Sequence, residues 1–134
     1  MNPYLSIIIP CYEGSKIIEK QLPLFISYLK SLPYSTELIV VDDGSKDGRV
    51  QQEIVESNGG LYLRNTVNVG KGASVRKGML AAQGQYRIFT DADIPFEYEA
   101  ISRMMDYLDR KEFHLVIGDR NLAQSSYFSE IRKI

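Results

Sequence analysis

Two carboxylates, Asp91 and Asp93, directly follow an apolar run in the segment FTDADIPF (residues 89–96). In an extended segment, residues two apart point to the same face, so both side chains can face one site. Close carboxylates repel each other unless a cation lies between them, and a divalent cation suits a diphosphate because it binds carboxylate and phosphate oxygens. The alternative is that both residues only solvate a turn and cap the next helix.

A second acidic segment, VVDDGSKDG (residues 40–48), follows another apolar run. Its Asp43 could accept hydrogen bonds from the N–H groups of a nucleobase. The same segment is typical of an Asx turn with Ser45 or Asp47 as a helix N-cap, because short polar side chains bind nearby backbone N–H groups. The two interpretations are compatible, and both place the segment between a strand and a helix.

The segment NVGKGASVRKG (residues 68–78) predicts a glycine-rich turn that leads into a helix carrying Lys71, Arg76 and Lys77. Backbone N–H groups at a helix start favour anions, and Lys71 or Arg76 could add positive charge for a phosphate. The segment is no Walker motif, because GxxxxGK(S/T) is absent, and it lacks the GxGxxG spacing. The alternative is a solvated basic helix without a ligand.

Two further residues have reactive side chains, but the sequence around them gives weak support for a catalytic role. His114, the only histidine, lies inside an apolar run, which favours a core or strand-edge role over catalysis. Cys11 has no histidine partner that the sequence can identify, so we expect a small buried side chain.

These segments lie between elements that alternate along the chain. Short, nearly continuous apolar runs predict strands buried on both faces of a parallel sheet. They cover residues 5–10, 37–42, 60–65, 86–91 and 113–119. Amphipathic stretches between them predict helices at 15–31, 46–58, 71–83 and 97–111. This alternation predicts right-handed crossovers and a layered α/β fold, followed by a polar and then weakly helical end at 121–134.

Polar residues gather at the ends of four of these predicted strands. They occupy residues 10–13, 42–45, 91–93 and 118–120. In open α/β sheets, ligands bind outside the carboxyl ends of the strands. We therefore expect the four ends to converge on one rim that holds a ligand.

The composition indicates one globular domain, residues 1–134, and gives no sign of a nucleic-acid partner. A net charge of −1 with interspersed acids and bases gives no electrostatic basis for binding nucleic acid. The single cysteine allows no internal disulfide and indicates a reducing compartment. No apolar run approaches the length of a membrane span and the N-terminus lacks a basic signal-peptide start, so we expect a cytoplasmic protein.

Four ordered segments carry a resemblance to a known family. They are IIIPCYEGSKI, ELIVVDDGSKDG, NVGKGASVRKGMLAAQGQYRIFTDADIPF and LVIGDRN. In order and spacing they resemble the inverting glycosyltransferases of family 2, and most of all the branch that passes a sugar to a polyprenyl or dolichyl phosphate. The resemblance implies the GT-A fold, a Rossmann-like, three-layer α/β fold with a mostly parallel central sheet flanked by helices.

By this resemblance, the strand ends would hold a nucleotide-diphosphate sugar. Pro10 and Tyr12 would line the nucleoside pocket, with Tyr12 near the base. Asp43 would bind the base. Asp91 and Ala92 would lie beside the ribose and the diphosphate.

The resemblance also implies charged groups around the transferred sugar. Asp93 would be the metal ligand, together with Asp91, and the cofactor would be Mn²⁺ or Mg²⁺. Lys71 and Arg76 fall in the stretch that closes over the nucleotide. Arg120 matches an arginine near the donor and acceptor phosphates, so Asp91, Asp93 and Arg120 are the implied catalytic residues.

Two departures from the family pattern limit this transfer of roles. The family often has Pro-x-Tyr-Asn-Glu, whereas here Glu13 takes the Asn place and Gly14 the Glu place, so the role of Glu13 as a nucleotide-sugar ligand stays open. Family members also extend into an acceptor-facing segment that this chain lacks. We therefore expect a truncation or a remnant that binds the donor weakly, transfers no sugar by itself, and self-associates through exposed apolar surface.

The implied reaction moves a hexose from a UDP-glucose-like or GDP-mannose-like donor to a polyprenyl or dolichyl phosphate, or to a glycan. A phosphate monoester has a second pKa of about 6, so at neutral pH its oxygen is already an anionic nucleophile. No general base is required, and displacement at the anomeric carbon would invert it. A lipid acceptor implies peripheral contact of the full-length protein with the cytoplasmic face of a membrane.

Two other functions fit parts of the sequence. A non-catalytic nucleotide-sugar-binding module would need only the donor site. A phosphoacceptor receiver domain has similar length and an acidic pair after a strand. In a receiver, however, the pair follows the first strand, whereas Asp42 and Asp43 follow the second, and no lysine ends the fifth.

Overall fold

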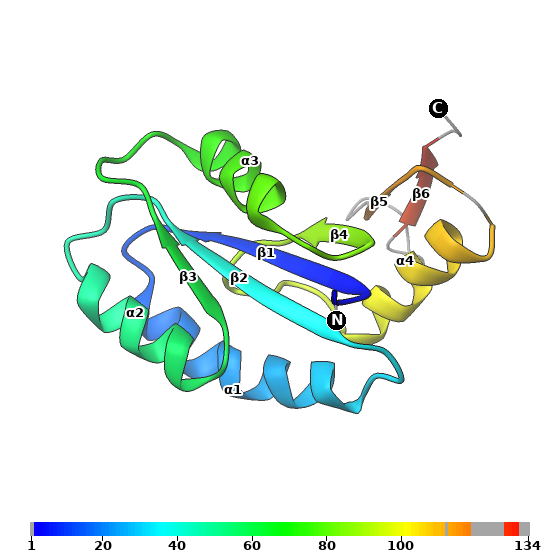
Figure 1. Cartoon of the computed structure of the whole chain (residues 1–134), viewed down its shortest axis with the longest axis horizontal. Helices are drawn as coiled ribbons and strands as arrows, with labels where there is room; N and C mark the ends of the chain where they lie inside the picture. The colour runs from blue at the N-terminus through cyan, green and yellow to red at the C-terminus, as the bar shows by residue number, and fades with distance from the viewer. Residues whose placement is uncertain (1, 112, 119–127, 132–134) are drawn as a thin grey trace. The chain divides into compact units, whose positions relative to one another are not determined.

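The computed structural model describes residues 2–111, 113–118 and 128–131. The chain divides into two compact units, residues 1–95 and residues 96–134. Figure 1 shows the elements of each unit.

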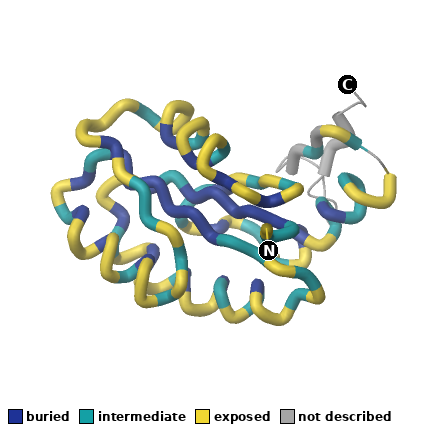
Figure 2. Tube along the Cα trace, viewed as in Figure 1, coloured by how far each residue is buried: buried dark blue, intermediate teal, exposed yellow. Residues whose placement is uncertain are grey.

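The first unit is built on a parallel four-stranded sheet. Its strands, in spatial order, are β3 (Leu61–Arg64), β2 (Thr36–Asp42), β1 (Leu5–Cys11) and β4 (Tyr86–Phe89). All three neighbouring pairs are parallel. The central strands β1 and β2 are largely buried, as Figure 2 shows, whereas β3 and β4 border the sheet and alternate between partly buried and exposed residues. Burial on both faces is thus confirmed for the central strands only, because an edge strand has a neighbour on one side.

Helices cover both faces of this sheet and make the predicted three layers. They are α1 (Ser15–Ser31), α2 (Gly48–Ser57) and α3 (Lys71–Ala81). In Figure 1, α1 and α2 lie on one face and α3 lies on the other. The fold class predicted from the sequence, α/β with a mostly parallel sheet, is confirmed, and each predicted helix of this unit overlaps an observed one.

The layers meet through close apolar contacts. Ile8, Ile39 and Val41 of the sheet form a buried cluster with Ala82, which directly follows α3. Gly78 of α3 lies so near β1 that a Cβ atom there would be 2.4 Å from Cγ2 of Ile8. α3 therefore packs directly on the sheet, and no larger side chain fits between Gly78 and Ile8.

The second unit contains α4 (Glu99–Asp109), β5 (Leu115–Gly118) and β6 (Phe128–Ile131). The strand β5 pairs antiparallel with β6 and does not join the four-stranded sheet. This corrects two predictions: the run at 113–119 is not a fifth parallel strand, and the part of the weakly helical end that the structure describes is a strand. Pairing with β5 outweighs the local helix preference of a short segment.

None of the helices in the described residues is both long and apolar enough to cross a membrane.

Candidate functional site

The carboxyl ends of β1, β2 and β4 lie side by side because the three strands are parallel neighbours. Backbone hydrogen bonds continue past the strands, from Asp43 N to Cys11 O (2.9 Å) and from Thr90 N to Ile8 O (3.0 Å). Three of the four predicted strand ends therefore share one rim. The fourth follows β5 in the second unit, and two of its residues, Asp119 and Arg120, lie outside the described residues.

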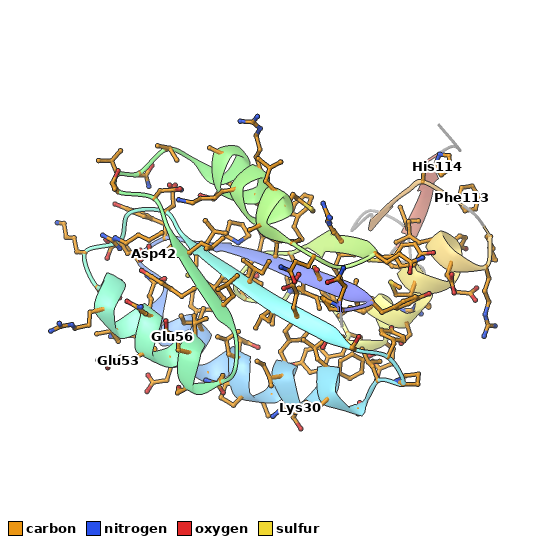
Figure 3. All side chains as sticks on the ribbon, in the orientation of Figure 1. Lys30, Asp42, Glu53, Glu56, Phe113 and His114 are labelled. Carbon is orange, nitrogen blue, oxygen red and sulfur yellow. The ribbon has the colours of Figure 1, made fainter. Side chains whose placement is uncertain are left out.

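Asp42, at the end of β2, is fully buried and anchors the elements on one side of the rim (Figure 3). One carboxylate oxygen accepts a hydrogen bond from Ser45 N (2.9 Å). The other accepts from the hydroxyl of Tyr62 (2.5 Å) and from Nη1 of Arg64 (2.6 Å). Burial, followed by the bond to Asp42, raises the pKa of Tyr62 to about 12. Asp42 thus joins β2, β3 and the turn before α2.

The neighbouring Asp43 is also buried but binds a different set of groups, those of the glycine-rich turn. Its Oδ1 accepts hydrogen bonds from Asn65 Nδ2 (3.0 Å) and Val69 N (2.8 Å), and its Oδ2 accepts from Gly70 N (2.9 Å). Burial alone raises the pKa of Asp43, but the bonds from Val69, Asn65, Gly70 and Ser74 outweigh it and hold the pKa below its usual value.

The observed role of Asp43 is therefore to hold the turn before α3 against the strand end. Both of its oxygens already accept hydrogen bonds within the chain, although a carboxylate offers about four acceptor sites. Binding of a nucleobase by Asp43 stays a prediction.

Two glycines let the turns approach each other this closely. Gly44 has φ +79°, and a Cβ atom there would be 2.6 Å from the carbonyl carbon of Val67. Gly70, directly before α3, has φ +101°. Both values favour glycine, because other residues adopt them only with strain. Asn65 completes the contact by donating to Ser74 Oγ of α3 at 2.9 Å.

The loop after β1 is tied to the turn after β2 by Glu13. Its backbone N donates to Ser45 Oγ (2.7 Å), and its Oε1 accepts from Lys46 N (2.7 Å). The same loop carries Tyr12, whose relative exposure is 52%, and follows the half-buried Pro10. In this structure Glu13 therefore joins two loops of the rim, and its contact with a nucleotide sugar stays a prediction.

The chain after β4 turns sooner than the sequence suggested. The strand ends at Phe89, and a hydrogen bond from Ile94 N to Asp91 O (3.0 Å) closes a turn through Ala92 and Asp93. The alternation of an extended segment therefore does not apply to Asp91 and Asp93. Ile94 is buried and has φ +45°, an unfavourable value for a β-branched residue that indicates backbone strain beside the two carboxylates.

Positive charge reaches this turn from α3. Lys71, the first residue of the helix, forms an ion pair through Nζ with Oδ1 of Asp91. The two side chains remain 57% and 41% exposed. Arg76 is exposed further along the same helix. The structure thus brings Lys71 and Asp91 together, two residues that the sequence placed in separate segments.

Asp91 and Asp93 are carboxylates, the ligand type that a hard divalent cation takes together with phosphate oxygens. In the part of the chain that the structure describes, no three His, Cys, Asp or Glu residues cluster as a metal site. Asp91 and Asp93 supply the two carboxylates of the turn, and the ammonium group of Lys71 already binds one of them as a cation. Such cations prefer carboxylate and phosphate oxygens and keep some waters, so two protein ligands suffice.

The two other reactive residues lie away from this arrangement. Cys11 is buried, and burial followed by the charge of Asp42 raises its pKa to about 12. It is a neutral thiol at physiological pH, which confirms the prediction of a packing residue. His114 is exposed and directly precedes β5, so a place inside the strand is wrong.

Sequence reasoning missed Asn65, Ser74 and the anchoring role of Asp42. Asn65, like Asp42, is a polar residue at the end of an apolar run, and that position could have marked it. Their partners could not be read from spacing, because each bond depends on which strands are neighbours in the sheet.

Residues 6–133 match the family described as "Glycosyl transferase family 2". The chain is 32% identical over 133 residues to a dolichyl-phosphate beta-glucosyltransferase of Dictyostelium discoideum, an alignment that covers 90% of this chain and 41% of that protein. It is 33% identical over 119 residues to the dolichol-phosphate mannosyltransferase of Saccharomyces cerevisiae, covering 86% and 45%. These matches do not favour a receiver domain or a non-catalytic module.

Solved structures of similar fold agree with this match. A mannosyltransferase from Pyrobaculum calidifontis, solved in complex with GDP-Man and Mn²⁺, superposes with a TM-score of 0.63 at 23% identity. The match covers 88% of this chain and 34% of that one. At this identity the likeness shows the fold alone.

Proposed function

Because the chain belongs to glycosyl transferase family 2, we propose that it forms the nucleotide-sugar-binding part of an inverting enzyme that glycosylates a polyprenyl or dolichyl phosphate. The observation that carries this proposal is the 32% identity over 90% of the chain to a dolichyl-phosphate beta-glucosyltransferase. The family match extends across both units, which supports their belonging to one catalytic domain. The chain spans less than half of its curated relatives, so the activity is proposed for the whole enzyme.

The rim would bind the nucleoside between the loops after β1 and β2. Tyr12 is half-exposed beside Pro10 and can offer its ring to the base, while Glu13 holds that loop in place. Asp43 would meet the base with its remaining acceptor capacity and keep the turn at Val69 and Gly70 closed beneath the ligand.

The diphosphate would lie between the first turn of α3 and the turn after β4. The N–H groups of a helix's first turn have no partner inside the helix, and α3 has no side-chain cap. Together with Lys71 and Arg76 they favour an anion at this place. Arg120, outside the described residues, is proposed to add charge near the donor and acceptor phosphates.

Asp91 and Asp93 would hold Mn²⁺ or Mg²⁺ at the diphosphate, with Ala92 beside the ribose. When bound, this cation neutralises the charge that develops on the leaving diphosphate. The reaction demands no general base, because an acceptor phosphate is already anionic at neutral pH. A lipid acceptor further implies membrane contact by the whole enzyme, and the exposed apolar residues of this chain favour self-association.

Calorimetric titration of the 134-residue chain with UDP-glucose, GDP-mannose, UDP and GDP, each with Mn²⁺ and with EDTA, tests the donor site. We expect at least one of these four ligands to bind, and to bind more tightly with Mn²⁺ than with EDTA. A parallel assay with dolichyl phosphate should show no transfer by this chain and transfer by the full-length protein. Failure of every nucleotide to bind would contradict the proposal, and donor binding without transfer by the full-length protein would indicate a non-catalytic module.

A further inference from the structure

Lys71 and Asp91 form a contact that the proposed binding of a cation at Asp91 would have to break. The contact joins the first residue of α3 to the turn that follows β4, both within the first unit. It uses Oδ1 of Asp91, one of the carboxylate oxygens proposed to bind the metal. A carboxylate oxygen that accepts from an ammonium group is a weaker ligand for a second cation, because the two positive charges repel.

The position of Lys71 favours an anion beside its ammonium group, both with and without a bound ligand. A helix N-terminus carries about half a positive charge, so a lysine at the first helical position is unfavourable unless an anion lies close by. The helix begins at Lys71 and has no acidic residue in its first turn. Asp91 supplies that anion in the ligand-free chain, and a diphosphate at the same helix end would supply it in the bound state.

The exposure of the pair makes exchange between these two anions easy. With side chains 57% and 41% exposed, Lys71 and Asp91 are strongly screened by water, and exposed pairs contribute little to stability. Asp43 meanwhile holds the preceding turn at Val69 and Gly70, so the helix start keeps its place while the lysine side chain moves.

We propose that Lys71 is an internal counter-ion that binds Asp91 in the ligand-free chain and moves to the diphosphate when the nucleotide binds, which makes metal binding depend on the nucleotide. The inference rests on the proposed function, because it assumes a diphosphate and a cation at this rim. In this scheme Lys71 binds the diphosphate directly when the nucleotide is present, and in the ligand-free chain it weakens the binding of a cation alone.

Electron paramagnetic resonance of free Mn²⁺ measures the affinity of the chain for the metal without any nucleotide. We expect Lys71→Met to bind Mn²⁺ about three-fold more tightly than the wild type, because an exposed ion pair and one positive charge are removed. The same variant should bind UDP or GDP about ten-fold more weakly in EDTA, because a charged hydrogen-bond donor is lost. These opposite signs separate the proposal from simple damage to the fold.

Three variants act as controls. Lys77→Met removes the same charge from the same helix, but from a lysine that donates to Arg64 O (2.7 Å), and should leave the Mn²⁺ affinity unchanged. Lys71→Arg keeps the counter-ion and should retain the weak Mn²⁺ affinity of the wild type. In an Asp91→Asn chain, Lys71→Met should no longer strengthen Mn²⁺ binding.

Unchanged or weaker Mn²⁺ binding by Lys71→Met, or no Mn²⁺ binding by either chain, would overturn the role of Lys71. If the wild type binds neither UDP nor GDP with Mn²⁺, the proposed function fails. The Mn²⁺ measurement without nucleotide still decides whether Lys71 competes for Asp91, so the two failures can be distinguished.

Discussion

The acidic pairs at the ends of β2 and β4 contain the same residue type and have opposite surroundings. Asp42 and Asp43 are buried, and their oxygens accept hydrogen bonds from β3, from the glycine-rich turn and from the turn before α2. Asp93 is exposed, and Asp91 is bound to a half-exposed lysine. A buried carboxylate that accepts several hydrogen bonds holds elements together, whereas an exposed, weakly paired one can exchange its partner for a ligand.

The difference has a physical basis in the place of each strand in the sheet and in its length. β2 has neighbours on both sides, so its end lies among other segments that supply donors. β4 is an edge strand of the four-stranded sheet and ends after four residues. The chain that follows it turns at Asp91. The rim therefore combines a buried half, with which we propose that a nucleoside makes contact, and an exposed half, with which we propose that a cation and a diphosphate make contact.

The largest expected effect concerns the buried half. Asp42→Ala should lower the free energy of unfolding by about 3 kcal/mol, because it leaves the buried partners of the carboxylate without an acceptor. Urea denaturation followed by circular dichroism measures the change. Asp93→Ala, at an exposed position, should stay within about 0.5 kcal/mol of the wild type. Equal losses in both variants would remove the distinction between the pairs.

A smaller effect is expected in the exposed half, on binding rather than on stability. Asp93→Asn should abolish the strengthening of nucleotide binding by Mn²⁺, a loss of about ten-fold or roughly 1.4 kcal/mol. Calorimetry with and without EDTA measures it. Glu53→Gln removes an exposed negative charge from α2 and should bind like the wild type. A collapsed melting transition of Asp93→Asn would instead make this residue structural.

The smallest expected effect is the acid response of the buried half. Hydrogen bonds hold the pKa of Asp43 below its usual value, and bonds from Ser15 and Gln51 lower the pKa of Asp47. A folded-state pKa below the unfolded one stabilises the fold above the unfolded pKa of about 3.9, and this stability is lost as the pH falls toward the folded value.

Asp43→Asn should therefore show a shallower loss of stability than the wild type as the pH is lowered from about 4. Unfolding curves recorded at several acidic pH values measure the two slopes. Parallel curves would mean that the carboxylate of Asp43 contributes no pH-dependent stability.

The sequence predicted the elements of the first unit well and their contacts poorly. The helix at 15–31 was predicted at its observed bounds, and the strand at 37–42 was within one residue. Such patterns are local, because burial of an apolar face imposes its period on neighbouring residues. The segment after β4 was mispredicted because an apolar run does not show where a strand stops, and the backbone of Ile94 turns it at Asp91.

The second unit was less predictable, because its secondary structure depends on strand pairing that a local pattern does not show. The segment that contains β6 was expected to be weakly helical, and only its pairing with β5 makes it a strand. Of the proposed site residues, Arg120 lies outside the described part of the chain, and its role stays a prediction.

By itself the sequence determined the α/β class, the order of the elements and the polar residues that end the strands, because apolar periodicity and turn chemistry act over a few neighbouring residues. Only the tertiary structure decided that Asp42 binds Arg64, Asp43 binds the turn at Val69, and Asp91 binds Lys71. Each of these pairs is separated by about twenty residues or more, and its members meet because parallel strands place their carboxyl ends side by side. The separation into buried anchors and exposed carboxylates follows from that packing.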